Sequence, residues 1–181
     1  GPVAAYDIRQ QCSGFLYGLD TADAALTTGR ATTALVVGAE AHAGYMPYGE
    51  SWKILRGERS GPPSDADYAS ATAARGYSVL FGDGAGALIL RTEPNAPGVL
   101  ASSLHTDGDL ADLIRVRAAG FRHQPWLDAA QVEAGLHHPT FNGLELFRQA
   151  ARRMPESVRS VAAAAGVTTD EIDVVVAHQA N

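Results

Sequence analysis

The feature that most constrains the fold is a pair of short apolar runs rich in β-branched residues, at 32–39 (TTALVVGA) and 173–177 (DVVVA). A continuous apolar run of this length, rather than an alternating one, is typical of a strand that is covered on both faces, as in a parallel sheet. Residues 15–28 place apolar side chains at helical spacing, and Gly29 is suited to end that helix. We therefore expect an α/β fold of layered helices and sheets.

The remaining pattern predicts more elements of both kinds. Strands are expected at 3–9, 77–81, 88–90 and 99–105. The first of these would lead through Cys12 into the helix and on to the strand at 32–39, which makes a βαβ unit.

Two helices are predicted near the end of the chain, at 143–153 and 155–165. Pro155 is expected in the first turn of the second helix and Gly166 after its last. Thr168 and Glu171 have the spacing of a capping box. Long loops are expected at 42–75, which is rich in aromatic residues, and at 106–140.

Composition excludes several classes of protein. The 181 residues are 46% hydrophobic and 19% charged, which is ordinary for a globular chain and rules out extensive disorder. A net charge of −6 argues against bulk attraction to nucleic acid. Because Cys12 is the single cysteine, no intramolecular disulfide and no cysteine-based zinc site can form. No apolar run is long enough to span a membrane and residues 1–5 lack a basic leader, so we expect a cytoplasmic protein.

Cys12 and His178 are the candidate catalytic residues. Cys12 lies where a predicted strand passes into a helix, and the N–H groups and dipole at a helix N-terminus favour a thiolate. His178 follows the predicted strand at 173–177, and ligands collect at the carboxyl ends of parallel strands. The two side chains could therefore meet as nucleophile and base or donor. A lone cysteine is more often a small buried apolar residue, so spacing alone leaves both interpretations open.

Segments spread along the chain resemble the β-ketoacyl-ACP synthase III enzymes. In chain order they are Asp7-Ile8 with Gln11-Cys12-Ser13-Gly14-Phe15, Arg75-Gly76 with residues 79–87 (VLFGDGAGA), residues 104–108 (LHTDG), residues 142–147 (NGLELF), and His178-Gln179-Ala180-Asn181. Each motif alone is weak, but their common order makes the match specific.

The resemblance implies a thiolase-like layered αβαβα fold, of which this chain would be the central portion. It also implies a decarboxylating Claisen condensation of an acyl-thioester such as acyl-CoA with malonyl-ACP or malonyl-CoA, in fatty-acid or specialised-metabolite biosynthesis. Carried over, Cys12 accepts the acyl group and His178 stabilises the enolate. Four further positions match family residues near the CoA or pantetheine arm: Arg75, Gly143, Phe147 and Asn181.

The same resemblance implies that thioesters are substrates and that no separate cofactor is needed. It implies an acyl carrier protein as partner and a homodimer. The family halves would divide this chain into 1–91 and 92–181. A segment before the nucleophile strand and a catalytic Asn after the final motif have no counterpart here. We therefore expect residues 1–181 alone to be poor at condensation, since losing one donor to a developing oxyanion commonly costs about 10²–10³ in rate.

Other signals have simpler explanations. Residues 82–87 (GDGAGA) fit a dinucleotide-binding pattern, but a strand follows where that pattern requires a helix, so we expect a tight hairpin or close backbone packing. The pairs His137–His138 and His105–Asp107 give no closed metal-ligand set. Arginines at 148, 152, 153 and 159 form a basic stripe that could face an acidic carrier protein or phosphates, or only solvent.

Two other functions remain open at this stage. The order Cys, His, Asn also suits a papain-like cysteine hydrolase, although the residues flanking Cys12 lack that family's pattern. A non-catalytic half-domain that lends an interface to a partner would need neither Cys12 nor His178.

Overall fold

A computed structural model of the chain describes residues 3–96, 98–122 and 124–180. The chain divides into two compact units, each made of segments that are distant in sequence. The first unit comprises Gly1–Glu40, Gly84–His105 and Pro155–Val175. The second comprises Ala41–Asp83, Thr106–Met154 and Val176–Asn181.

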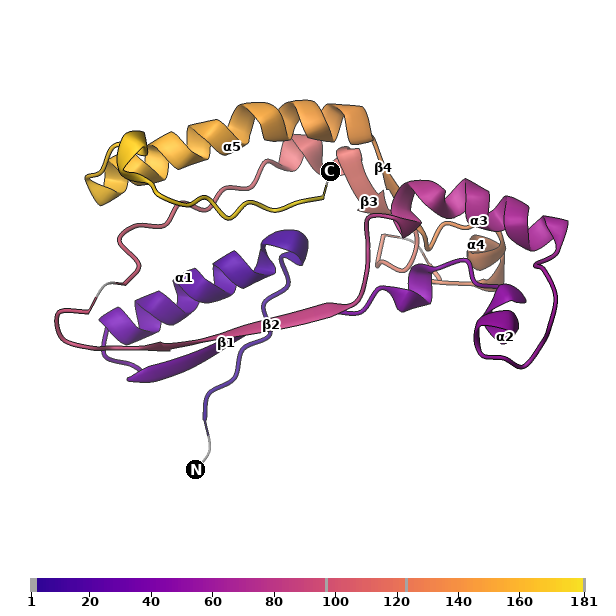
Figure 1. The fold of residues 1–181 in the computed structure, drawn as a ribbon, viewed down its shortest axis with the longest axis horizontal. Helices are drawn as coiled ribbons and strands as arrows, with labels where there is room; N and C mark the ends of the chain where they lie inside the picture. Colours follow the sequence, from indigo (N-terminus) through magenta and orange to yellow (C-terminus); the bar gives the residue numbers. More distant parts are fainter. Residues whose placement is uncertain (1–2, 97, 123, 181) are drawn as a thin grey trace. The chain divides into compact units, whose positions relative to one another are not determined.

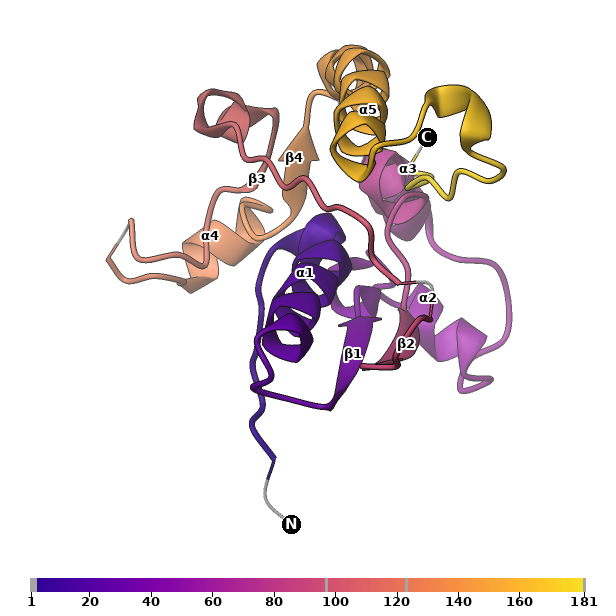
Figure 2. The same ribbon diagram turned by 90° about the vertical axis from the view of Figure 1, so that its left-hand side faces the viewer.

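The first unit is built on a helix and a two-stranded ribbon (Figures 1 and 2). A short 3₁₀ turn, η1 (Gln11–Ser13), leads into helix α1 (Gly14–Thr27). The helix ends as expected before Gly29, which has a φ of 72°. Strand β1 (Thr33–Glu40) then pairs with β2 (Gly84–Arg91), in a register that sets Thr33 opposite Arg91 and Glu40 opposite Gly84. The helix lies along one face of this ribbon.

Small residues let α1 approach β1 closely. A Cβ added at Gly38 of the strand would lie 3.2 Å from Phe15 Cδ2, and one added at Gly18 of the helix would lie 3.1 Å from Val36 Cγ1. Phe15 at the start of the helix thus meets the end of the strand, and Gly18 meets its middle. The N-terminus of α1 therefore lies over the carboxyl end of β1.

The second unit holds most of the short elements. They are η2 (Ala43–Tyr45), α2 (Ser51–Leu55), α3 (Asp65–Ser78), η3 (Gly108–Leu113), β3 (Ile114–Val116), α4 (Ala129–Glu133) and β4 (Pro139–Phe141). Strands β3 and β4 pair antiparallel, with Ile114 opposite Phe141. The N-terminus of α3 is capped by Ser64, whose side chain accepts the Asp67 N–H. A capping box between Asp128 and Gln131 starts α4.

The last helix and turn only partly follow the sequence prediction. Residues 143–153 and 155–165 form one helix, α5 (Gly143–Ala165), with Pro155 inside it rather than starting a new helix. Proline has no N–H for the carbonyl four residues earlier, but a single missing bond does not end this long helix. The predicted end at Gly166 (φ 72°) and the Thr168–Glu171 capping box, which opens η4 (Thr169–Glu171), are both confirmed.

Several predicted strands are wrong. Residues 3–9, 99–105 and 173–177 form neither helix nor strand, and residues 77–81 are the end of α3 and the turn after it. In the 173–177 run, Val174 and Val176 expose 74% and 94% of their surface. A strand requires a neighbouring strand for its N–H and C=O groups, and an apolar run does not supply one.

The first sheet also differs from the prediction. The strand at 32–39 forms, shifted by one residue, but it pairs antiparallel with β2 and is mostly exposed rather than buried in a parallel sheet. Residues 84–87 belong to β2, so the glycine-rich stretch is strand and not the predicted tight hairpin.

The buried core is small. Among the described residues, the buried apolar side chains are Ala22, Leu26, Val36, Ala74, Tyr77, Ala118 and Ala162. In the described part of the chain, no helix combines the length and apolar character needed to cross a bilayer.

Candidate active site

Cys12 lies in the η1 turn that opens α1, as the sequence predicts, and its side chain is exposed. The Ser13 N–H donates to Gln10 O (3.1 Å), and the Gly14 N–H donates to Gln11 O. Gln11 adopts a φ of 42°, which is uncommon for a residue with a side chain and marks local strain. The sharp turn presents the thiol to solvent beside the positive end of the helix.

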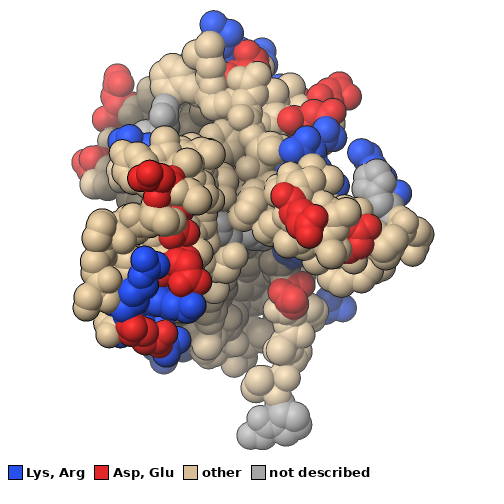
Figure 3. All heavy atoms as spheres, turned by 90° about the vertical axis from the view of Figure 1, so that its right-hand side faces the viewer, with Lys and Arg blue, Asp and Glu red and all other residues tan. Residues whose placement is uncertain are grey.

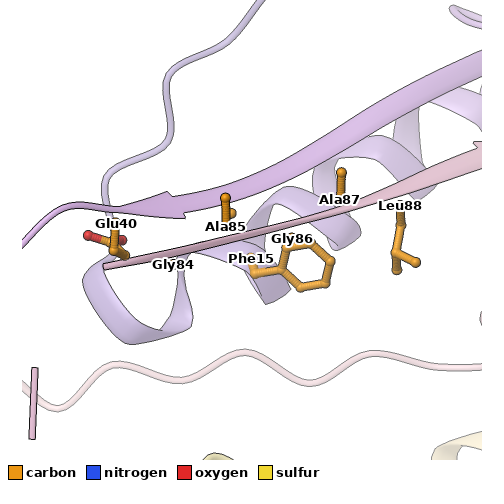
Figure 4. A pocket seen from close by; sticks show the side chains of 8 residues that line it. Phe15, Glu40, Gly84, Ala85, Gly86, Ala87 and Leu88 are labelled. Atoms are coloured by element: carbon orange, nitrogen blue, oxygen red, sulfur yellow. The ribbon is translucent and has the colours of Figure 1, made fainter. Parts of the chain in front are cut away.

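The carboxyl end of β1 carries an open depression of about 530 Å³. Figure 4 shows its lining, where Phe15 of α1 lies under the ribbon and Ala85 and Ala87 point to the opposite side. The full lining is Phe15, Gly38, Glu40, Gly84, Ala85, Gly86, Ala87 and Leu88. The glycine that packs against Phe15 is Gly38 of β1, whereas an added Cβ at Gly82, Gly84 or Gly86 would meet open space, so the close packing expected of residues 82–87 is not seen at these glycines. Phe15 follows Cys12 by less than one helical turn.

His178 lies in the exposed extended segment near the end of the chain. It belongs to the second unit, whereas Cys12 belongs to the first. Their meeting as a catalytic pair therefore stays a prediction.

Three of the four residues proposed near a pantetheine arm lie on helices α3 and α5, in the parts of these helices that belong to the second unit. Arg75 is exposed in the last turn of α3. Gly143 begins α5, where Asn142 Oδ1 accepts the Glu145 N–H (3.2 Å), and Phe147 follows one turn later with 53% of its surface exposed. Asn181 lies outside the described residues.

The sequence analysis missed the role of Asp83. Its Oδ1 accepts the backbone N–H groups of His42 (2.6 Å) and Ala43 (3.0 Å). His42 Nδ1 lies 3.1 Å from Gly82 O, and its ring stacks on Phe81. The carboxylate thus joins the backbone that leaves β1 to the backbone that enters β2. An Asp between two glycines beside a strand is a signal for such a turn-fixing carboxylate.

A second missed feature is a stack of three rings in the second unit. Tyr77 Oη lies 3.2 Å from His138 Nδ1, with ring centroids 5.3 Å apart, and the His137 ring lies 3.9 Å from that of His138. Burial lowers the pKa of His138, with a further contribution from His137, and burial raises the pKa of Tyr77. In the described part of the chain, His137 Nδ1 is buried without a hydrogen-bond partner.

Histidines and arginines of the sequence-based candidate sites contact other side chains of the chain. Within the described residues no group of three or more His, Cys, Asp or Glu could hold a metal ion. His105 Nε2 lies 2.8 Å from Ser103 Oγ instead. In the arginine stripe, Arg153 pairs with Asp107 and Arg148 with Glu145. On the face drawn in Figure 3, acidic and basic side chains lie side by side rather than gathering by sign.

The aromatic loop after β1 forms its own depression. Tyr48 and Trp52 lie with ring centroids 5.0 Å apart, tilted by 37°. An open hollow of about 360 Å³ is lined by Ala43, Gly44, Met46, Tyr48, Gly49 and Trp52.

Comparison with known proteins places these features in one family. A family profile described as 3-oxoacyl-[acyl-carrier-protein (ACP)] synthase III matches residues 6–54 and 65–108. A β-ketoacyl-[acyl-carrier-protein] synthase III of Erythrobacter litoralis is 38% identical over 180 residues, which are 98% of this chain and 46% of that protein. A Streptomyces coelicolor protein, β-ketoacyl-[acyl-carrier-protein] synthase III 3, is 38% identical over 183 residues. The chain thus spans about half the length of the curated relatives it matches.

Solved structures agree with the sequence comparison. The β-ketoacyl-[acyl carrier protein] synthase III of Thermus thermophilus superposes with a TM-score of 0.66 at 26% identity, covering 92% of this chain and 43% of that one. The corresponding Pseudomonas aeruginosa enzyme gives a TM-score of 0.58 at 28% identity. The expected thiolase-like α/β fold is therefore confirmed for this portion, although several of its strands are not formed here. The cysteine-hydrolase alternative gains no support from these similarities.

Proposed function

We propose, since this chain belongs to the 3-oxoacyl-[acyl-carrier-protein] synthase III family, that it takes part in the decarboxylating condensation of an acyl-thioester with a malonyl-thioester. The observation that carries the proposal is the exposed thiol of Cys12 in a strained turn at the N-terminus of α1. A thiolate at such a position is a soft nucleophile and a good leaving group, which acyl transfer between thioesters requires.

In the proposed reaction, the Cys12 thiolate attacks the carbonyl of an acyl-CoA, the carbonyl carbon–sulfur bond to CoA breaks, and CoA leaves as a thiolate that takes a proton from solvent. The backbone N–H of Cys12 helps to hold the oxyanion. Loss of CO₂ from the malonyl-thioester then leaves an enolate, whose oxygen His178 stabilises. The enolate carbon attacks the acyl-Cys12 carbonyl, and the new C–C bond forms as the thiolate departs. Fixed donors to such oxyanions are worth about 3 kcal/mol each.

Binding of the thioester arm is assigned to Arg75, Gly143, Phe147 and Asn181 on the family resemblance. The exposed positions of Arg75 and Phe147 in the second unit are compatible with contact to a ligand. Acyl-CoA and an acyl carrier protein are the proposed partners, a cytoplasmic homodimer is the proposed assembly, and no separate cofactor is required.

Intact-mass spectrometry against a panel of acyl-CoAs tests the acylation step. Because the chain has a single cysteine, one added acyl group that is lost in Cys12→Ser assigns the site without ambiguity. We expect stoichiometric acylation of the natural sequence. Absence of any acylated species, or acylation that persists in Cys12→Ser, would overturn the proposal.

A further inference from the structure

The stack of Tyr77, His138 and His137, which we name the ring clamp, joins two segments far apart in the sequence. Tyr77 is in the last turn of α3, and both histidines precede β4. Tyr77 is 9% exposed and is among the few buried side chains of the described residues. The contact therefore joins two segments of the second unit that are 61 positions apart in the sequence.

The ring clamp connects segments that carry the proposed binding residues. Arg75 stands two residues before Tyr77, and Gly143 stands five residues after His138. Leu80 and Phe81 N–H groups donate to Tyr77 O at 3.0 and 3.2 Å, so the backbone that follows α3 depends on where Tyr77 is held. The position of Tyr77 therefore affects both of the segments that carry the proposed binding residues.

Protonation state decides whether the clamp can stay closed. Tyr77 Oη and His138 Nδ1 share a hydrogen bond in which either atom can be the donor, because the direction depends on the imidazole tautomer. Burial and the nearby His137 ring lower the pKa of His138, so a positive charge on this half-buried ring disfavours the packed arrangement. The titratable groups facing His138 are Tyr77 from α3 and His137 beside it, and neither supplies a negative charge at neutral pH.

We propose that Tyr77, His137 and His138 form an acid-released clamp that holds the Arg75 end of α3 against the segment leading to Gly143. Closed at neutral pH, it positions the surface that binds the thioester arm. Protonation of His138 opens it and lets that surface come apart. The positioning role rests on the proposed function, whereas the clamp itself does not.

Hydrogen exchange tests the clamp directly. We compare protection factors of the 79–81 amides, corrected for intrinsic exchange, at about pH 7.5 and about pH 5.5, the range in which histidine titrates. Protection should fall several-fold in acid for the natural sequence. It should be independent of pH in His138→Phe, which keeps a stacking ring but cannot be protonated. A natural sequence whose protection does not fall, or a His138→Phe that falls equally, would overturn the clamp.

Two conservative variants test the hydroxyl. Tyr77→Phe keeps the ring and removes the hydroxyl, so its 79–81 amides should be less protected at about pH 7.5 than those of the natural sequence. Tyr68→Phe is the matched control, because Tyr68 is on the same helix and is 70% exposed. Equal protection in both variants would show that the hydroxyl bond does not hold the helix end.

Coenzyme A binding separates the clamp from the proposed function. Calorimetry at the same two pH values should show weaker binding in acid for the natural sequence and an unchanged dissociation constant for His138→Phe. If the binding of coenzyme A does not change with pH while the 79–81 amides lose protection in acid, the positioning role is overturned. No binding at either pH would overturn the proposed function, and the exchange result would still decide the clamp.

Discussion

The α1–β1–β2 region and the segment at 172–180 share an apolar, β-branched character but have different structures. Strand β1 has a partner in β2 along its whole length and a helix packed on one face, and Val36 is only 7% exposed. The later run has neither, and Val175 is 64% exposed. An apolar run supplies the tendency to be buried, and only a neighbouring strand and a packing surface turn it into a strand.

This difference separates the two candidate catalytic residues. Cys12 lies in the turn that immediately precedes α1, which packs closely on β1 at Gly18 and Gly38. This packing holds the turn that contains Cys12. His178 follows a run that has no such support. Substitutions in the two regions therefore test whether the packed region, rather than the apolar run, carries the stability of the chain.

The largest effect is expected from Leu26→Ala, which removes a side chain that is 9% exposed at the end of α1. Loss of buried methylenes and the cavity left behind should lower the free energy of unfolding by about 2–4 kcal/mol. Urea unfolding monitored by circular dichroism measures it. Val175→Ala is the control, and its exposed side chain should change stability by less than about 0.5 kcal/mol. Equal losses in the two variants would mean that the two runs are packed alike.

A smaller loss is expected from Gly38→Val. The new Cβ would lie 3.2 Å from the Phe15 ring, so α1 must move away from the ribbon, at about 1–3 kcal/mol. Gly86→Val is a close control, because Gly86 pairs with Gly38 across the ribbon and has open space around an added Cβ. If thermal unfolding shows that Gly86→Val loses more stability than Gly38→Val, the close approach of α1 to Gly38 does not determine the position of the helix.

The sequence predicted local elements better than pairings. Helix α1, its end at Gly29 and the Thr168–Glu171 box were predicted correctly because each depends on residues within a few positions. The order of motifs also identified the family and the turn at Cys12. The antiparallel partner of β1 was missed because sheet pairing depends on residues about 50 positions away. The Tyr77–His138 contact was missed for the same reason, since those residues are separated by 61 positions.

An intermediate effect is expected at the joint between β1 and β2. Asp83→Ala removes the acceptor of the His42 and Ala43 N–H groups and should cost about 1 kcal/mol, reduced by the exposure of the site. Asp83→Asn keeps an oxygen acceptor and should lose less than half as much. Chemical unfolding of both variants measures the difference. An Asn variant as unstable as the Ala variant would show that the negative charge, not the acceptor geometry, fixes the joint.

The smallest effect concerns the turn that precedes the unsupported run. Hydrogen bonds from the Thr168 N–H and hydroxyl, both 2.8 Å from Glu171 Oε2, lower the pKa of Glu171 below its usual value of 4.5. A carboxyl whose pKa is lower in the folded state stabilises that state above its unfolded pKa, and the contribution disappears as pH falls through the folded value. The thermal midpoint of Glu171→Gln should therefore lie slightly below that of the natural sequence at about pH 6, and the gap should close at about pH 3. Glu133→Gln, at an exposed position on α4, should show no such closing gap. If the difference in thermal midpoint between Glu171→Gln and the natural sequence is the same at about pH 3 as at about pH 6, the Glu171 carboxylate does not stabilise the turn. The stretch from 168 to 180 would then lack even this local stabilising contact.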